Sequence, residues 1–201
     1  METAPIEICE TFFEKITTQS SEGLLTRMAE HAYHGAERVR LVVSSPGGQV
    51  ASTMTLITKL TESPIELVTH ATGEIASMGV MLFLAGDKRL ASPEATFLMH
   101  PITVETPAGW PTAAPWLDVE DIRKLRTKVE RSGAPPKLFT ELDLGIVRLT
   151  REEREVQKIF EERTNLTGPE VKALVWGHTT VSAAYACAVG IVHEVIPASR
   201  S

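Results

Sequence analysis

The sequence predicts an α/β fold in which short strands alternate with helices. Short apolar runs recur along the first half of the chain, and segments with apolar residues at helical spacing lie between them. Turns rich in Pro, Gly and Ser separate the two kinds of segment. This alternation favours crossover connections and a mainly parallel sheet.

The first half of the chain supplies most of the expected sheet. Strands are expected at residues 6–12, 39–43, 65–69, 88–91 and 96–99. Helices are expected between them at residues 20–34, 50–61 and 80–85. The last of these helices carries almost no polar atoms, so we expect it to be buried.

The second half is mostly helical and is interrupted by prolines. A Pro-rich stretch at residues 101–116 is expected to be irregular. Helices are expected at residues 119–129, 149–164, 170–176 and 182–189, and a terminal strand at 191–196. The length of 201 residues suits one domain. We expect that domain to have a core of about residues 5–101 and 166–197 and an insert of about 102–165.

Composition excludes several classes of protein. Lys and Arg number 20 and Asp and Glu number 26, which gives a net charge of −6. That acidic balance argues against duplex nucleic acid or an anionic membrane as partner. The apolar run at residues 78–86 is far shorter than the ~20 residues that span a bilayer. Cys9 and Cys187 lack the spacing of a disulfide framework or a metal site. The N-terminus shows no secretory signal, so we expect a cytoplasmic protein. The sequence has no HExxH motif, no P-loop and no carboxylate cluster with metal spacing, so we expect neither metal nor cofactor.

Three features with chemical potential follow predicted strands. The first is Ser77, which lies between a strand and the buried helix, where a helix N-terminus favours developing negative charge. The same serine could instead be an ordinary helix cap. The second is the Gly47-Gly48 turn, whose backbone N–H groups could face a ligand or simply reverse the chain. The third is His100, a candidate general base, although a surface histidine after a strand is the plainer interpretation.

The order of these features resembles the proteolytic subunit of the Clp protease. The segments that carry the resemblance are SSPGGQV at 44–50, GEIASMGVMLFLAGDKRLASPEATFLMHP at 73–101 and SAAYACAVGIVHEVI at 182–196. The resemblance covers residues 36–101 closely and 164–196 more loosely. It implies the crotonase-like ββα superhelix with a helical handle region, here the 102–165 insert, and assembly of identical subunits into stacked rings around a chamber.

The resemblance also implies a role for each site residue. Ser77 would be the nucleophile and His100 its general base. The backbone N–H groups of Gly48 and Met78 would form the oxyanion hole. An extended peptide substrate would pair with an edge of the chain formed by Gly47, Gly48, Gln49 and Val50.

The sequence departs from the family at the position of the third catalytic residue. The family has an acid there, whereas this chain has His178. An acid holds the base in one tautomer and stabilises the imidazolium, which a histidine does not do in the same way. His178 could accept a hydrogen bond from His100, or it could be a loop residue without a catalytic task. Thr179, Thr180 or a distant carboxylate could orient His100 instead.

Two further departures concern assembly. The insert looks longer than the family's handle, so ring pairing or ring size is expected to differ. The chain begins close to its first strand, so the family's axial loops, which meet an AAA+ ATPase, are expected to be absent. Such an ATPase is therefore a candidate partner, but the resemblance alone does not predict that this chain binds one.

These observations leave three hypotheses for function. The first is a serine endopeptidase that cleaves peptides or unfolded protein through an acyl-enzyme on Ser77. The second is a non-catalytic ring subunit, because of His178. The third is an acyl-CoA enzyme of crotonase type, for which Glu74 is the nearby carboxylate. A paired serine and histidine favour hydrolysis over acyl-CoA chemistry.

Overall fold

The structure, a computed structural model, describes residues 7–197. Residues 5 and 6, which the predictions assigned to the core and to the first strand, lie outside this range. The chain divides into two compact units. Unit 1 consists of residues up to 100 and from 159 onward, and unit 2 consists of residues 101–158. The prediction of one domain stays a prediction.

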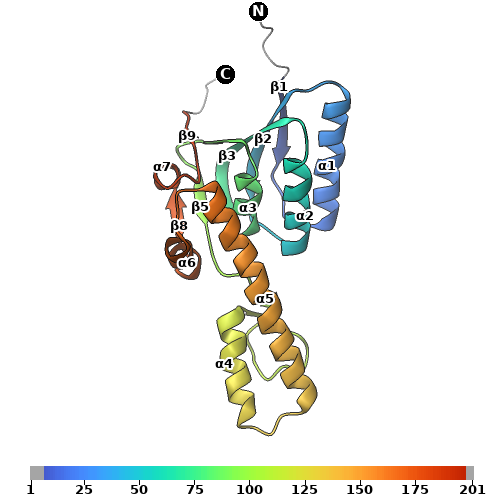
Figure 1. Ribbon diagram of the computed structural model, residues 1–201, viewed down its shortest axis with the longest axis vertical. Helices are drawn as coiled ribbons and strands as arrows, with labels where there is room; N and C mark the ends of the chain where they lie inside the picture. Colours follow the sequence, from blue (N-terminus) through green and yellow to red (C-terminus); the bar gives the residue numbers. More distant parts are fainter. Residues whose placement is uncertain (1–6, 198–201) are drawn as a thin grey trace, which may run out of the picture. The chain divides into compact units, whose positions relative to one another are not determined.

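Unit 1 is built on a mostly parallel sheet (Figure 1). Its strands are β1 (Glu7–Phe12), β2 (Arg38–Ser45), β3 (Glu66–Ala76), β4 (Lys88–Ala91), β5 (Thr96–Leu98), β8 (Thr180–Ser182) and β9 (Glu194–Val195). The strands β1, β2, β3, β4 and β9 lie side by side in that order. β3 pairs with β4 along its first half and with β5 along its second, and β8 joins β5 in the antiparallel direction.

Three helices pack together beside this sheet in unit 1. They are α1 (Thr18–Tyr33), α2 (Val50–Thr61) and α3 (Met78–Leu84). Every second residue of β2 is buried, as expected for a strand with one face against a core. α3 is buried over its whole length, as the sequence predicts. The short helices α6 (Gly168–Trp176) and α7 (Ala183–Ala188) also belong to unit 1.

On the face of the sheet opposite the buried residues of β2, acidic and basic side chains of neighbouring strands form ion pairs. From β1 to β9 the ion pairs join Glu7 to Arg38, Arg38 to Glu66, and Lys88 to Glu194. Parallel sheets are usually covered on both faces. These cross-strand ion pairs suit a face that remains in contact with water.

Two titratable groups of unit 1 have shifted pKa values. Burial alone would raise the pKa of Glu10, but hydrogen bonds from His31, the Thr11 N–H and Arg27 lower it below its ordinary value. His70 on β3 lies 3.3 Å from the Ser92 hydroxyl, and burial together with the charge of Arg40 lowers its pKa.

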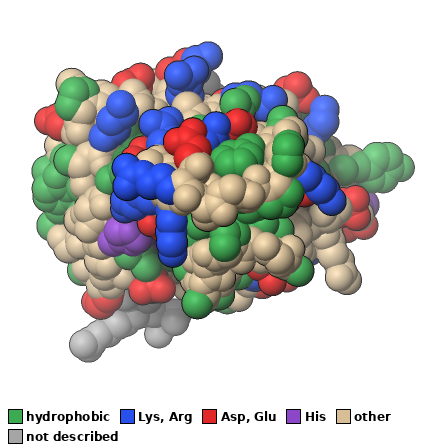
Figure 2. Space-filling view, turned by 90° about the horizontal axis from the view of Figure 1, so that it is seen from below, with side chains coloured by type: hydrophobic (Ala, Val, Ile, Leu, Met, Phe, Trp, Pro, Cys, Tyr) green, Lys and Arg blue, Asp and Glu red, His purple; other side chains and the backbone are tan. Residues whose placement is uncertain are grey.

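Unit 2 has its own small core. It contains the hairpin β6 (Val104–Glu105) and β7 (Trp116–Leu117) and the helix α4 (Val119–Glu130). The long helix α5 (Pro136–Arg163) contributes residues to both units. Trp110, Ile122, Leu142 and Leu149 are among the buried residues of this core. Pairs of opposite charge lie three or four residues apart along α4 and α5. Figure 2 shows basic and acidic side chains next to one another on one face of the molecule.

The α/β class is confirmed, and several element boundaries differ from the predictions. β3 continues to Ala76 rather than ending at residue 69, because β2 and then β5 supply hydrogen-bond partners along its second half. α5 begins at residue 136 rather than 149, since Gly145 fits against Ile122 and Trp110 without interrupting the helix. The stretch 101–116 holds β6, and β8 was not predicted.

Candidate active site

Ser77 lies at the junction of β3 and α3 in a backbone conformation that L-residues rarely adopt. Its φ is 54° and its ψ is −130°. Such a conformation costs on the order of 1–3 kcal/mol and is concentrated at functional sites. The Ser77 N–H donates to the Leu98 carbonyl at 2.8 Å, which anchors the turn to β5. Ser77 occupies the N-cap position of α3, but its side chain makes no capping hydrogen bond. The cap interpretation therefore does not explain this serine.

The turn after β2 lies directly against Ser77. A Cβ atom built on Gly47 would stand 2.6 Å from the Ala76 carbonyl oxygen, 2.8 Å from the Ser77 Cβ and 2.9 Å from the Met78 nitrogen. Gly47 also has a φ of 84°, which favours glycine. Only a residue without a side chain lets this backbone approach the serine so closely.

Two backbone N–H groups beside Ser77 remain outside the regular hydrogen-bond pattern. Met78 is the first residue of α3, so its N–H has no partner within the helix. Gly48 pairs with Ile16 as an isolated parallel bridge, whose bonds run through Gly47 and Gln49. The N–H of Gly48 itself therefore faces away from Ile16. Both amides predicted for the oxyanion hole thus come from adjoining turns.

His100 follows β5, the neighbour of β3. Ala76 pairs with Leu98, so Ser77 and His100 both follow the carboxyl ends of adjacent parallel strands. Sites in open α/β sheets are built at this edge. On its other side β5 pairs with β8, and the Met99 N–H donates to the Thr179 carbonyl at 2.9 Å.

This pairing brings His178 opposite His100. Leu98 pairs with Thr180 in the antiparallel direction, so continuing the register places His100 beside His178. The two imidazole rings are nearly parallel, with an angle of 13° between their planes and 6.3 Å between their centroids. His178 has a left-handed φ of 47° just after α6. Its N–H donates to the Val175 carbonyl at 3.2 Å.

The predicted substrate edge has a mixed outcome. The Gly47 carbonyl and the Gln49 N–H already pair with Ile16, at 2.8 and 2.9 Å. Val50 begins α2 rather than continuing a strand. The Ile16 bridge does not use the backbone groups of Gly48 or the N–H of Val50 in the first turn of α2. An incoming peptide could pair only with these groups of the predicted edge. Pairing with a peptide stays a prediction.

Sequence reasoning missed the segment that follows β1. Ile16 is fully buried and bonds to both sides of Gly48, while the Glu14 carbonyl accepts a hydrogen bond from the Ser45 hydroxyl at 2.7 Å. No local pattern marks Ile16, because its role depends on a contact across more than thirty positions. The buried position of Ser45 in the alternation of β2 is a signal that the sequence does contain.

Residues 7–197 contain neither a metal-binding cluster nor a membrane-crossing helix. In that range no group of three or more His, Cys, Asp or Glu side chains is arranged to hold a metal ion. Nor does any helix in the same range have both the length and the apolar character needed to cross a membrane.

A strained serine and a histidine that follows the adjoining strand lie at the carboxyl edge of a mostly parallel sheet, and this arrangement defines an α/β protein with its candidate site at that edge. The family model described as Clp protease matches residues 6–134, more than half of the chain. The chain belongs to the Clp protease family.

Relatives and a solved structure agree with this assignment. The chain is 34% identical over 89 residues to the ATP-dependent Clp protease proteolytic subunit 1 of Mycobacterium leprae. It is 39% identical over 64 residues to proteolytic subunit 2 of Mycolicibacterium paratuberculosis. These matches span 43% of each chain in the first case, and 31% of this chain and 32% of the relative in the second. The matched region is thus less than half of each curated relative.

The fold is similar over nearly the whole chain to that of a ClpP1 mutant from Listeria monocytogenes. The TM-score is 0.72, the identity is 16%, and the match covers 95% of this chain and 92% of the other. The ClpP-like α/β fold expected from the sequence is thereby confirmed.

Proposed function

We propose that this chain is a serine endopeptidase subunit that cleaves peptides or unfolded protein through an acyl-enzyme on Ser77. The observation that carries the proposal is the backbone of Ser77, with φ 54° and ψ −130° between β3 and α3. This conformation holds the serine at the carboxyl edge of the sheet without a capping bond. Strain of this kind is retained where the reaction needs the geometry.

The proposed reaction uses four groups of the chain. The Ser77 hydroxyl attacks the scissile carbonyl carbon while His100 takes its proton. The N–H groups of Gly48 and Met78 donate to the oxygen that becomes negative, which is where such donors contribute most. His100 then gives its proton to the leaving amine. Water, with His100 again as base, hydrolyses the acyl-enzyme and frees Ser77.

A serine-reactive fluorophosphonate probe tests this proposal. The wild-type protein should be labelled, and Ser77→Ala should not. Peptide hydrolysis should disappear in the same variant. Ser182→Ala is the matched control, since Ser182 caps α7 by accepting from the Tyr185 N–H and lies outside the proposed chemistry. Equal labelling of the wild type and Ser77→Ala would refute the proposal.

A second candidate function rests on His178. This residue stands beside His100, where the resemblance places an acid, so a non-catalytic subunit of an assembly remains the alternative. Loss of a triad acid costs on the order of 10⁴ in rate in the best-studied serine peptidase. A stable oligomer that the probe never labels would support this alternative. Ser77-dependent turnover would exclude it.

Assembly and location follow from family membership as proposals. A ring of identical subunits would enclose the sites in a chamber, since one chain of this size cannot do so. An AAA+ ATPase as partner and a cytoplasmic location remain expectations. The number of subunits in the ring can be measured by analytical ultracentrifugation.

A further inference from the structure

The turn that carries Gly48 needs an external support. Two adjacent glycines and the absence of regular secondary structure leave this backbone little stiffness of its own. An oxyanion donor contributes only when it is already oriented before the reaction.

Three connections, made of four hydrogen bonds, link the turn to residues 14–16. The Ile16 N–H donates to the Gly47 carbonyl at 2.8 Å, and the Gln49 N–H donates to the Ile16 carbonyl at 2.9 Å. The third connection runs through a side chain. The Gly47 N–H donates to the Ser45 hydroxyl oxygen at 3.1 Å, and that hydroxyl donates to the Glu14 carbonyl at 2.7 Å.

The geometry determines the role of each atom in this relay. A carbonyl can only accept, and an amide N–H can only donate. The Ser45 hydroxyl must therefore send its hydrogen to Glu14 and receive the hydrogen of Gly47. Ser45 is 1% exposed, so water does not offer an easy substitute for either bond.

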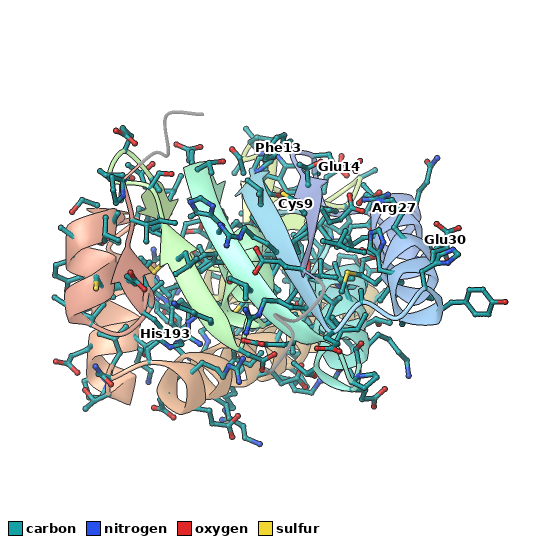
Figure 3. All side chains as sticks on the ribbon, turned by 90° about the horizontal axis from the view of Figure 1, so that it is seen from above. Cys9, Phe13, Glu14, Arg27, Glu30 and His193 are labelled. Atoms are coloured by element: carbon teal, nitrogen blue, oxygen red, sulfur yellow. The ribbon has the colours of Figure 1, made fainter. Side chains whose placement is uncertain are left out.

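The support is anchored at its far side as well. The Ser20 hydroxyl in the first turn of α1 donates to the Lys15 carbonyl at 2.9 Å. Figure 3 shows Phe13 and Glu14 next to each other beyond β1, and Phe13 is 60% exposed. Residues 14–16 are therefore hydrogen-bonded to the first turn of α1 on one side and to the turn beside Ser77 on the other.

We propose that Ser45 is a positioning residue that orients the Gly48 amide for the oxyanion through its bonds to Gly47 and Glu14. The inference rests on the proposed peptidase function. It assigns no contact between Ser45 and the substrate.

Ser45→Ala removes both bonds and tests the inference. Removing a whole oxyanion donor costs about 10²–10³ in kcat, so a misaligned donor should cost ~10- to 100-fold. KM should change by less than about twofold, because the donor acts mainly in the transition state. Affinity for a peptide boronic acid, which forms a tetrahedral adduct with serine, should fall in parallel with kcat.

Two further variants separate positioning from general stability. Ser45→Cys fills the same space with a weak acceptor and should give an intermediate kcat. Ser44→Ala is the matched control. The Ser44 hydroxyl donates to the Glu74 carbonyl at 3.2 Å and does not bond to Gly47, so kcat should stay within about twofold of the wild type. A similar loss in Ser44→Ala and Ser45→Ala would overturn the inference.

Hydrogen exchange of the turn gives a readout that does not depend on turnover. The segment 46–49 should exchange faster in Ser45→Ala than in the wild type while the rest of β2 stays protected. If wild-type hydrolysis survives Ser77→Ala, the proposed function fails, and exchange alone then decides whether Ser45 holds the turn. If hydrolysis depends on Ser77 but Ser45→Ala keeps its kcat and boronate affinity, the positioning role fails alone.

Discussion

Replacing Arg89 by methionine should destabilise unit 1 strongly. Arg89 is 4% exposed, and its guanidinium donates to four backbone carbonyls. Nε donates to Ile191 at 2.8 Å and Nη1 to Gly86 at 3.2 Å, while Nη2 donates to Arg163 at 2.7 Å and to Gly190 at 3.0 Å. One side chain thus ties the segment after α3 to the end of α5 and to the turn after α7.

The size of the effect follows from these bonds and from the cost of burying the charge. Hydrogen bonds to charged groups contribute about 1.5–3 kcal/mol each, so four set an upper limit of roughly 6–12 kcal/mol. Burial, and then the nearby charge of Arg163, lowers the pKa of Arg89 to about 10, so the fold disfavours the charge that makes the bonds. At neutral pH Arg89 remains charged. We therefore expect a net loss of about 3–5 kcal/mol, the range found when one partner of a buried charged network is removed.

Urea unfolding followed by circular dichroism measures this loss. For a chain of this size, about 3–5 kcal/mol corresponds to a fall in Tm of roughly 6–20 °C. Lys59→Met is the control, because Lys59 is exposed and its ion pair with Glu62 lies on the surface. Its free energy of unfolding should change by less than about 0.5 kcal/mol. A loss below about 1 kcal/mol in Arg89→Met would refute the reasoning from the four carbonyls.

Four other substitutions give separate tests. Gly47→Ala should reduce peptide hydrolysis at least ~10-fold, since its Cβ would overlap the Ala76 carbonyl oxygen, the Ser77 Cβ and the Met78 nitrogen, and an unchanged kcat would contradict this contact. Glu10→Gln should lower the free energy of unfolding by about 1–2 kcal/mol at pH 7. Because the pKa of Glu10 is lowered, the stability that it provides is present above its ordinary pKa of 4.5 and is lost as the pH falls further, so the mutant and wild-type urea curves should converge in acid. The lowered pKa of His70 means that the fold favours its neutral form, so stability should decline as the pH drops below 6.5, and His70→Gln should flatten that decline in a pH series of melts. Gly145→Ala should raise Tm by the equivalent of about 0.5–1 kcal/mol, because its Cβ would meet neighbours at ordinary contact distances and alanine favours the helix; a lower Tm would contradict this packing.

Local sequence was sufficient for the elements with strong periodicity. The predicted helix at 50–61 has the bounds of α2, and the strand at 88–91 has those of β4. The buried apolar run after Ser77 is α3. α2 has apolar residues at helical spacing and turn residues at its ends, so no distant contact is needed to specify it.

Elements that depend on distant partners were predicted poorly. The second half of β3 contains Thr72, Gly73 and Glu74, which do not resemble a buried strand. The strand continues to Ala76 because Ile75 pairs with Ser45 of β2 after a break in register and residues 74–76 pair with β5. β8 is a strand only because it pairs with β5 across more than eighty positions. Propensity yields to tertiary pairing in such segments.

The candidate site shows the same division. The sequence by itself determined the α/β class, the order of Gly48, Ser77 and His100, and the unusual histidine at 178. The first two can be read from residue type and from position after a strand, whereas His178 is unusual only by comparison with the acid that the family has there. The tertiary structure decided that Ser77 has a φ of 54°, that the ring of His178 lies parallel to that of His100, and that Ile16 and Ser45 support the turn at Gly48. Backbone strain and hydrogen bonds between distant segments exist only once the sheet has assembled, because neither is a property of the residue that bears it.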